Sequence, residues 1–212
     1  INLFLQSIKT YHPRSNIIHC TNFDTEAFSK ADDVFRNELN DNQLMMSRIE
    51  SYSKLNISEP SIYLDTDMLI MKKIPIETFI DTADIFLLNR SFNKDKNLPI
   101  NFRGQVFENH KKGSLGYLYP YIGCLIICKT NEFWKICLNY YNKLEDKYKF
   151  WFGDQIILKK IVNENKFRFG FLQESEFACP PFYIHDKKRP FIIHFKGKNT
   201  KSLIEKYFKY II

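Results

Sequence analysis

The chain has 212 residues, of which 44% are hydrophobic and 16% aromatic, and its formal net charge is +7. This size and composition indicate a globular protein with a sizeable core and exclude an intrinsically disordered chain, which would contain fewer large apolar residues. The seven glycines form neither G-x-G-x-x-G nor G-x-x-x-x-G-K-[ST]. Any phosphate chemistry must therefore use something other than a glycine-rich loop.

Helical and extended patterns alternate along the chain. In chain order they predict a helix over 3–10, a strand over 16–20, helices over 25–38 and 41–55, strands over 61–64, 84–88 and 123–128, helices over 131–146 and 154–163, strands over 167–172 and 191–195, and a helix over 200–210. Residues 90–118 are polar, and a long loop of this kind is often functional. The alternation predicts one α/β domain with a mixed, mainly parallel sheet flanked by helices, and ligands at the carboxyl ends of its strands.

The five cysteines lack paired C-x-x-C spacing, and Cys124 and Cys128 lie in an apolar run. We expect both to be buried free thiols, and reduced thiols predict a cytoplasmic protein. The longest apolar runs are too short to span a bilayer, and the first residues show no signal-peptide pattern.

The clearest motif is the pair Asp65 and Asp67, which follows the apolar run Ser61–Leu64. In an extended chain, side chains at i and i+2 project to the same side. Two carboxylates on one side suit Mn²⁺ or Mg²⁺, with substrate phosphates completing the octahedron. A turn is the other interpretation, because Asp is common in turns. Apolar residues on both sides favour the metal site, since two acids there cost stability unless something binds them.

A second motif places His194 near the end of a strand, followed by Gly197, Lys198 and Lys201. An imidazole can complete a site that carboxylates begin, Gly197 permits close approach of a ligand to the backbone, and the lysines can neutralise phosphate. A lone histidine is more often a hydrogen-bonded core residue, so that interpretation stays open.

A third motif is Asp154-Gln155, which follows aromatic residues at the predicted start of a helix. Helix capping accounts for Asp154 but not for Gln155. Basic residues also gather in the last 26 positions, and such a tail could attract nucleic acid, an anionic membrane or a diphosphate. A solvated lysine-rich face is an equally good interpretation of these charges. They are Lys187, Lys188, Arg189, Lys196, Lys198, Lys201, Lys206 and Lys209.

In this order and spacing, the three motifs resemble those of the GT-A-fold glycosyltransferases, especially glycosyltransferase family 8, which includes glycogenin and bacterial galactosyltransferases. The matching segments are Tyr63-Leu-Asp65-Thr-Asp67, Asp154-Gln155 and His194-Phe-Lys-Gly197. The resemblance covers most of the chain and implies a GT-A-like, Rossmann-like domain over residues 1–212. The family carries a basic residue on the helix before its D-x-D strand, and Arg48 lies at nearly that distance.

The resemblance implies that a hexose is transferred from a nucleotide-diphosphate sugar, such as a UDP-sugar, to a glycan, lipid-linked or protein acceptor. It implies a Mn²⁺ or Mg²⁺ site made by Asp65, Asp67 and His194, and a catalytic role for Asp154 and Gln155. It implies a retaining outcome with Gln155 near the reacting face and no dedicated base, whereas an inverting enzyme would need a base, for which Asp154 is the candidate. The donor contacts that it implies are Arg48, Thr66, Gly197, Lys198 and Lys201.

The chain departs from the family pattern at three places. The family lysine beyond the glycine falls on Thr200, so Lys198 or Lys201 must take its place. The sugar-contacting N-[AS]-G reads Tyr121-Ile-Gly123. The sequence shows no counterpart of the strand that opens the family's nucleotide-binding region, and we expect that strand to lie upstream of residue 1.

Three alternatives remain. A nucleotidyltransferase or a phosphatase could use the Asp65–Asp67 site, although neither accounts for His194-Phe-x-Gly. A basic nucleic-acid-binding domain would account for the charge and the aromatic residues. We expect no nucleic-acid partner, and we expect that the basic C-terminal segment could hold the protein at a membrane surface.

Overall fold

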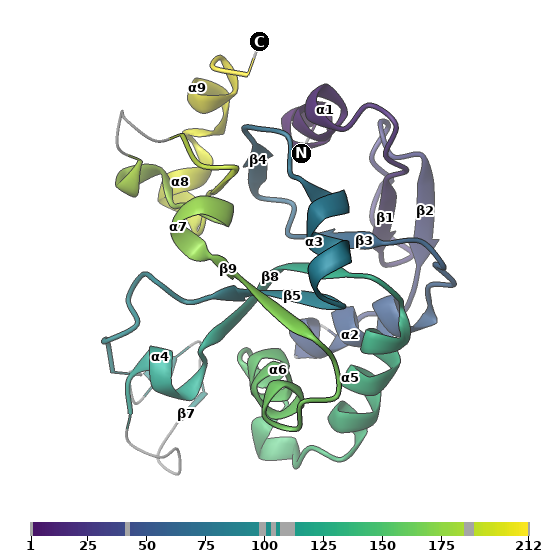
Figure 1. Ribbon diagram of the computed structural model, residues 1–212, viewed down its shortest axis with the longest axis vertical. Helices are drawn as coiled ribbons and strands as arrows, with labels where there is room; N and C mark the ends of the chain where they lie inside the picture. Colours follow the sequence, from purple (N-terminus) through teal and green to yellow (C-terminus); the bar gives the residue numbers. More distant parts are fainter. Residues whose placement is uncertain are drawn as a thin grey trace.

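A computed structural model describes residues 2–40, 43–97, 101–102, 105–106, 113–184 and 189–211, the side chains of 101–102, 105–106 and Lys198 excepted. Its elements, shown in Figure 1, are α1 (Asn2–Tyr11), β1 (Ile18–Thr21), β2 (Asp33–Arg36), α2 (Leu44–Lys54), β3 (Ser61–Leu64), β4 (Met68–Ile70), α3 (Ile76–Thr82), β5 (Ile85–Asn89), β6 (Asn101–Phe102), β7 (Gln105–Val106), α4 (Leu115–Leu118), β8 (Tyr121–Cys128), α5 (Glu132–Asn142), η2 (Asp146–Tyr148), α6 (Gly153–Asn163), β9 (Phe169–Gln173), α7 (Glu174–Phe177), η3 (Pro181–Tyr183), β10 (Ile192–His194), α8 (Lys198–Lys201) and α9 (Ile204–Phe208).

The central sheet has the strand order β3-β8-β5-β9. Strand β8 runs antiparallel to both β3 and β5, whereas β5 and β9 are parallel, so β3, β5 and β9 all point the same way. The register sets Asn89, the last residue of β5, beside Tyr121 of β8 and Gln173 of β9. The carboxyl ends of three strands and the start of β8 therefore meet at one edge. The predicted mixed α/β sheet flanked by helices is confirmed.

Two further strand pairs lie beside this sheet. Strands β1 and β2 are parallel, and β4 and β10 are antiparallel with Met68 opposite His194. Among the described residues, β1 pairs only with β2 and β3 pairs only with β8. The expected strand before residue 1 stays a prediction.

Apolar side chains cover both faces of the central sheet. Along β5 the side chain of Leu88 joins a cluster with α1 and α3, and that of Leu87 joins a cluster with α2, α5 and α6. This alternation follows from the two-residue period of a strand. Strand β5 is almost wholly buried because helices lie on each side of it.

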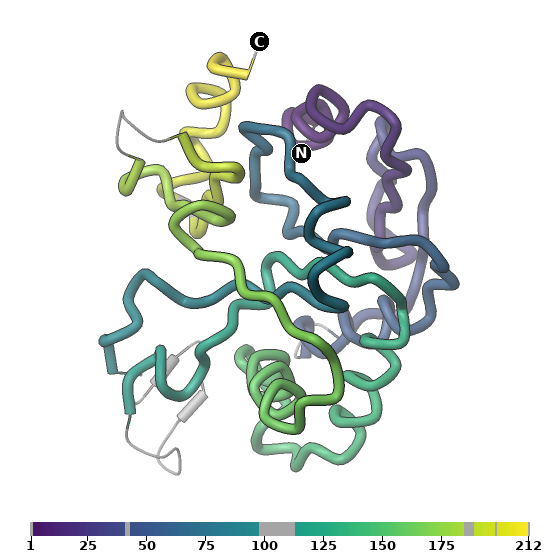
Figure 2. Tube along the Cα trace, in the orientation of Figure 1, coloured from purple at the N-terminus to yellow at the C-terminus, as the bar shows by residue number. Residues whose placement is uncertain are grey.

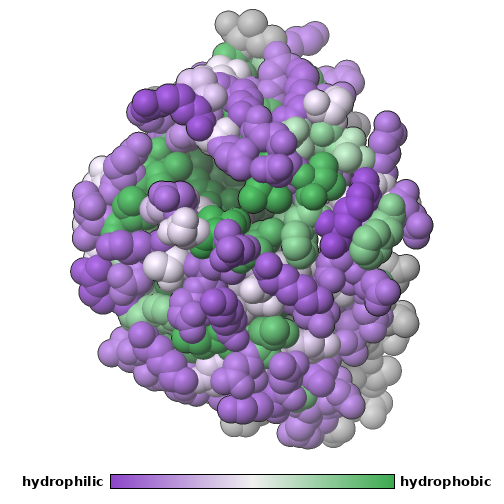
Figure 3. Space-filling model, turned by 90° about the vertical axis from the view of Figure 1, so that its right-hand side faces the viewer, coloured by the Kyte–Doolittle hydropathy of each residue, from purple (hydrophilic) through white to green (hydrophobic). Residues whose placement is uncertain are grey.

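The two ends of the described chain lie on the same side of the molecule (Figure 2). Leu3 of α1 packs in one cluster with Phe208 and Ile211, next to β4 and β10. The face that carries β1 and β2 is largely hydrophilic, but apolar residues gather in a hollow in its upper part (Figure 3). No helix among the described residues is both long and apolar enough to cross a membrane.

Two predicted helices are corrected. Residues 25–38 do not form a helix, because 33–36 are strand β2, paired with β1. The apolar residues of this segment fit helical spacing, but Val34 and Phe35 also favour a strand, and pairing with β1 decides the outcome. Residues 200–210 are divided between α8 and α9. Cys124 and Cys128 are buried free thiols, as predicted.

Candidate functional site

Charged side chains follow the ends of the three strands of the central sheet that point the same way. Asp65 follows β3, Arg90 follows β5, and Glu174 follows β9. Gly123 of β8 lies at the same edge, since Asp65 N–H donates to the neighbouring Cys124 carbonyl at 3.0 Å. The polar groups of these elements converge at the carboxyl edge, where α/β sheets bind ligands.

Asp65, Asp67 and His194 lie together at this edge. His194 Nε2 is 3.1 Å from Asp67 Oδ1 and 4.0 Å from Asp65 Oδ2, and one ligand atom from each residue lies within 4.8 Å of the others. The two aspartates stand in a bend between β3 and β4 rather than in the extended chain expected. The pairing of β4 with β10 brings His194 to them, and Phe195 N–H donates to the Asp67 carbonyl at 2.8 Å.

The chemistry of this donor set fits a divalent cation. His194 is 2% exposed, and its Nε2 faces two carboxylates. Its Nδ1 has no hydrogen-bond partner among the described residues, so the protein orients the ring mainly through Nε2. Two carboxylate oxygens and one imidazole nitrogen leave coordination positions for phosphate oxygens or water.

The charges around Asp67 favour its ionised form. Burial alone would raise the pKa of Asp67, but the hydrogen bond and charge of His194, with the charge of Lys201, lower it. Lys201 Nζ lies 3.3 Å from Asp67 Oδ2 and is half exposed. Lys201 therefore reaches the cluster. Thr200 instead is buried, and its hydroxyl donates to the Lys196 carbonyl at 2.7 Å.

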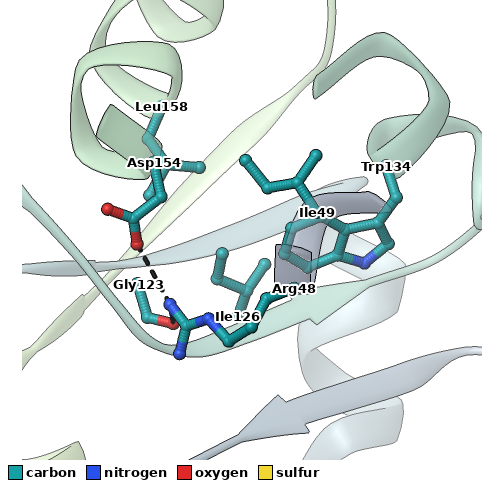
Figure 4. A pocket seen from close by; sticks show the side chains of 7 residues that line it. All are labelled: Arg48, Ile49, Gly123, Ile126, Trp134, Asp154 and Leu158. Carbon is teal, nitrogen blue, oxygen red and sulfur yellow. Dashed lines mark hydrogen bonds and ion pairs between the residues drawn. The ribbon is translucent and has the colours of Figure 1, made fainter. Parts of the chain in front are cut away.

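Arg48 of α2 joins the two aspartate motifs. Its Nη1 donates to Asp65 Oδ1 at 2.5 Å, and its Nη2 donates to Asp154 Oδ2 at 3.0 Å, the ion pair drawn in Figure 4. Burial would lower the pKa of Arg48, but the charges of Asp65 and Asp154 outweigh it and raise the pKa. One guanidinium thus fixes the distance between the candidate metal cluster and the start of α6.

Gly123 makes room for this ion pair. A Cβ at position 123 would lie 2.3 Å from Asp154 Oδ2 and 3.1 Å from Arg48 Nη2. Gly123 is the glycine that the chain shares with the family's N-[AS]-G, whose first two positions are replaced here by Tyr121 and Ile122. The structure gives a local reason for a glycine at this position, because β8 and α6 can approach each other this closely only if residue 123 has no side chain.

Asp154 and Gln155 are both buried at the start of α6. Burial raises the pKa of Asp154 to about 6, although the neighbouring Arg48 and the N–H of Gln155 act against the rise. Gln155 Oε1 accepts a 2.7 Å hydrogen bond from Arg90 Nη2. The two side chains of this motif therefore have different cationic partners, Arg48 for the acid and Arg90 for the amide.

Arg90 and Glu174 are site residues that the sequence interpretation missed. Glu174 is 2% exposed, and its Oε1 lies 3.2 Å from Lys196 Nζ. Each follows a predicted strand within one or two residues, and that position was the available signal. Of the other predicted donor contacts, Thr66 is exposed, Gly197 has φ +82°, and the side chain of Lys198 lies outside the described part.

No family model matches the chain, and no curated protein matches its sequence. Solved structures do share its fold. The galactosyltransferase LgtC, in complex with donor and acceptor sugar analogues, is 11% identical with a TM-score of 0.58, over 99% of this chain and 89% of its own. A glycosyltransferase involved in glycosylation of the major capsid of PBCV-1 is 14% identical with a TM-score of 0.54, over 91% of this chain and 98% of its own.

A third similar structure is a putative glucose-1-phosphate thymidylyltransferase from Bacillus anthracis. It is 8% identical with a TM-score of 0.50, over 96% of this chain and 79% of its own. The chain resembles these proteins in fold, and a fold does not determine the reaction, which depends on the residues of the site. The chain has the GT-A fold, and the solved structures that it resembles include a family 8 galactosyltransferase.

Proposed function

We propose that this protein is a metal-dependent glycosyltransferase that moves a hexose from a nucleotide-diphosphate sugar, such as a UDP-sugar, to an acceptor. The observation that carries the proposal is the cluster of Asp65, Asp67 and His194 at the carboxyl edge of a GT-A sheet. We propose that residues 1–212 form one domain, which would hold this cluster.

Asp65, Asp67 and His194 would hold Mn²⁺ or Mg²⁺. When bound, the cation neutralises the negative charge that develops on the departing nucleoside diphosphate. Lys201 Nζ, 3.3 Å from Asp67 Oδ2 and half exposed, is placed to contact a phosphate oxygen as well. We assign the same role to Lys198, and we assign the backbone of Gly197 and the exposed Thr66 to donor contact.

Arg48 and Asp154 would position the reacting sugar beside the diphosphate. Asp154 is 5% exposed and paired with Arg48, so its carboxylate is engaged within the protein. An inverting transfer needs a carboxylate that accepts a proton from the acceptor hydroxyl. The buried ion pair supports the other course, a retaining transfer with Gln155 at the reacting face and Arg90 holding its amide.

The acceptor would be a glycan, a lipid-linked sugar or a protein, and we assign no nucleic-acid partner. Lys201, Lys206 and Lys209 of the basic C-terminal segment are exposed. Attachment of this segment to an anionic membrane surface stays a prediction.

The proposal is tested by incubating the protein with a panel of nucleotide sugars and Mn²⁺ and separating the nucleotides by chromatography. We expect nucleoside diphosphate to be released from at least one donor, and release to stop with EDTA or in Asp67→Asn. Asp81→Asn, at an exposed aspartate of α3, is the matched control and should keep the activity.

A parallel incubation with nucleoside triphosphates and sugar phosphates tests the nucleotidyltransferase alternative, since a thymidylyltransferase shares the fold. That enzyme class joins a nucleoside triphosphate to a sugar phosphate and releases pyrophosphate. Pyrophosphate production from those substrates, with no diphosphate released from nucleotide sugars, would reject the glycosyltransferase proposal. A phosphatase would instead form a phosphoaspartate, which a phosphate mimic would trap.

A further inference from the structure

Two aromatic side chains stack beside the candidate site and have no part in the donor chemistry. Phe92 lies two residues after Arg90, and Tyr183 ends η3. Their ring centroids are 4.3 Å apart and their planes differ by 25°. Tyr183 is 48% exposed and Phe182 before it is 72% exposed. We call Phe92 and Tyr183 the aromatic pair.

Glu174 holds the Phe92 side of the aromatic pair at the site edge. Its Oε2 accepts hydrogen bonds from Ser91 N–H and Phe92 N–H, each at 2.9 Å, while its Oε1 contacts Lys196 Nζ at 3.2 Å. A carboxylate so deeply buried needs such partners. Glu174 therefore connects the segment after β5 to the segment after β10, the strand that ends in His194.

The Tyr183 side of the pair is held by η3. Pro180 and Pro181 restrict its backbone, and Tyr207 Oη donates to the Pro181 carbonyl at 3.1 Å. The pair thus presents a large, partly exposed aromatic surface whose position is set before any ligand arrives. Rigid aromatic surfaces bind ligands at a low cost in conformational entropy.

We propose that the aromatic pair is an acceptor subsite that binds a pyranose ring of a glycan. The C–H groups on one face of such a ring are slightly positive, and the face of an aromatic ring is negative. Arg90, which bonds Gln155 and lies two residues before Phe92, connects the pair to the start of α6. The donor would lie at the metal cluster and the acceptor at the pair. This assignment rests on the proposed function and narrows the acceptor to a sugar.

The test is saturation-transfer NMR with an equimolar mixture of the methyl glycosides of galactose, glucose, mannose and N-acetylglucosamine. We expect saturation of ring C–H protons in at least one glycoside. Phe92→Leu and Tyr183→Leu keep an apolar side chain but remove the aromatic face, and we expect each to reduce the signal at least fivefold. Tyr183→Phe should keep the signal.

Phe23→Leu is the matched control, because Phe23 is 63% exposed and lies in the connection between β1 and β2. It should leave the signal unchanged. No saturation of any glycoside by the unaltered protein, or an undiminished signal in Phe92→Leu and Tyr183→Leu, would overturn the subsite.

Donor hydrolysis by the unaltered protein is measured in parallel with Mn²⁺, without an acceptor. Hydrolysis without sugar binding at the pair would retain the glycosyltransferase proposal and reject the subsite. Sugar binding at the pair, in a protein that hydrolyses no nucleotide sugar, would reject the proposed function and the acceptor role together. We expect the unaltered protein both to hydrolyse a nucleotide sugar and to bind a glycoside, and we expect the leucine variants to lose the sugar binding.

Discussion

The contact between Gly123 and the Arg48–Asp154 ion pair leads to a prediction about a single methyl group. In Gly123→Ala, the new Cβ would lie 2.3 Å from Asp154 Oδ2. Moving that oxygen out to 3.0 Å, the shortest separation that Cβ atoms tolerate, requires a shift of 0.7 Å. The carboxylate has little freedom to shift, since Oδ1 accepts from Gln155 N–H at 2.8 Å and Oδ2 from Arg48 at 3.0 Å.

We expect Gly123→Ala to destabilise the fold by about 1–3 kcal/mol, the usual cost of an overpacked buried site. The gain from a less flexible unfolded chain, about 0.4–1 kcal/mol, offsets part of this cost. Urea unfolding followed by the fluorescence of Trp134 and Trp151 measures the change. Donor hydrolysis should fall as well, because Arg48 could no longer keep its hydrogen bonds to both Asp65 and Asp154.

The decisive comparison is made in an Asp154→Ala background, where the clashing oxygen is gone. There Gly123→Ala should cost less than about 0.5 kcal/mol, so that the two substitutions are strongly non-additive. Equal destabilisation in both backgrounds would show that the glycine is needed for another reason, and would refute the argument for the ion pair.

Three further predictions concern the same edge. Burial raises the pKa of Asp154 to about 6, so between about pH 4 and pH 6 the folded protein keeps a proton that the unfolded chain releases. The free energy of unfolding should therefore fall as the pH rises through this window, and pH-dependent urea titrations should show a flatter slope in Asp154→Asn. Gly197 has φ +82° and ψ 167°, a region open essentially to glycine, so Gly197→Ala should lower the free energy of unfolding by about 1–3 kcal/mol in the same titrations. Lys201→Ala should weaken binding of a nucleoside diphosphate about tenfold in calorimetry, and the difference should shrink at high salt.

The parts of the site that the sequence predicts are those set by local pattern. Asp65 and Asp67 are recognisable because an apolar strand ends at them, and Asp154-Gln155 because a helix begins there. His194 is recognisable because a short apolar strand ends in it. Each of these signals lies within a few neighbouring residues.

The rest depends on which strands become neighbours, and that is a property of the whole fold. Arg90 and Glu174 each follow a recognisable strand, but only the order β3-β8-β5-β9 puts these strands in one sheet, where Arg90 reaches Gln155 and Glu174 reaches the segment after β5. The same reason accounts for the error at 25–38, where the apolar spacing suits two periods and the pairing of β2 with β1 decides between them.

The central claim is that Asp65, Asp67 and His194 bind a divalent cation together with a nucleoside diphosphate. Calorimetric titration of UDP into the protein, with and without Mn²⁺, tests it most directly, with Asp67→Asn and Asp81→Asn measured alongside. We predict that UDP binds the unaltered protein and Asp81→Asn tightly only when Mn²⁺ is present, and that Asp67→Asn loses at least tenfold in affinity while remaining folded. Equal UDP affinity with and without Mn²⁺, or in Asp67→Asn and Asp81→Asn, would contradict the claim.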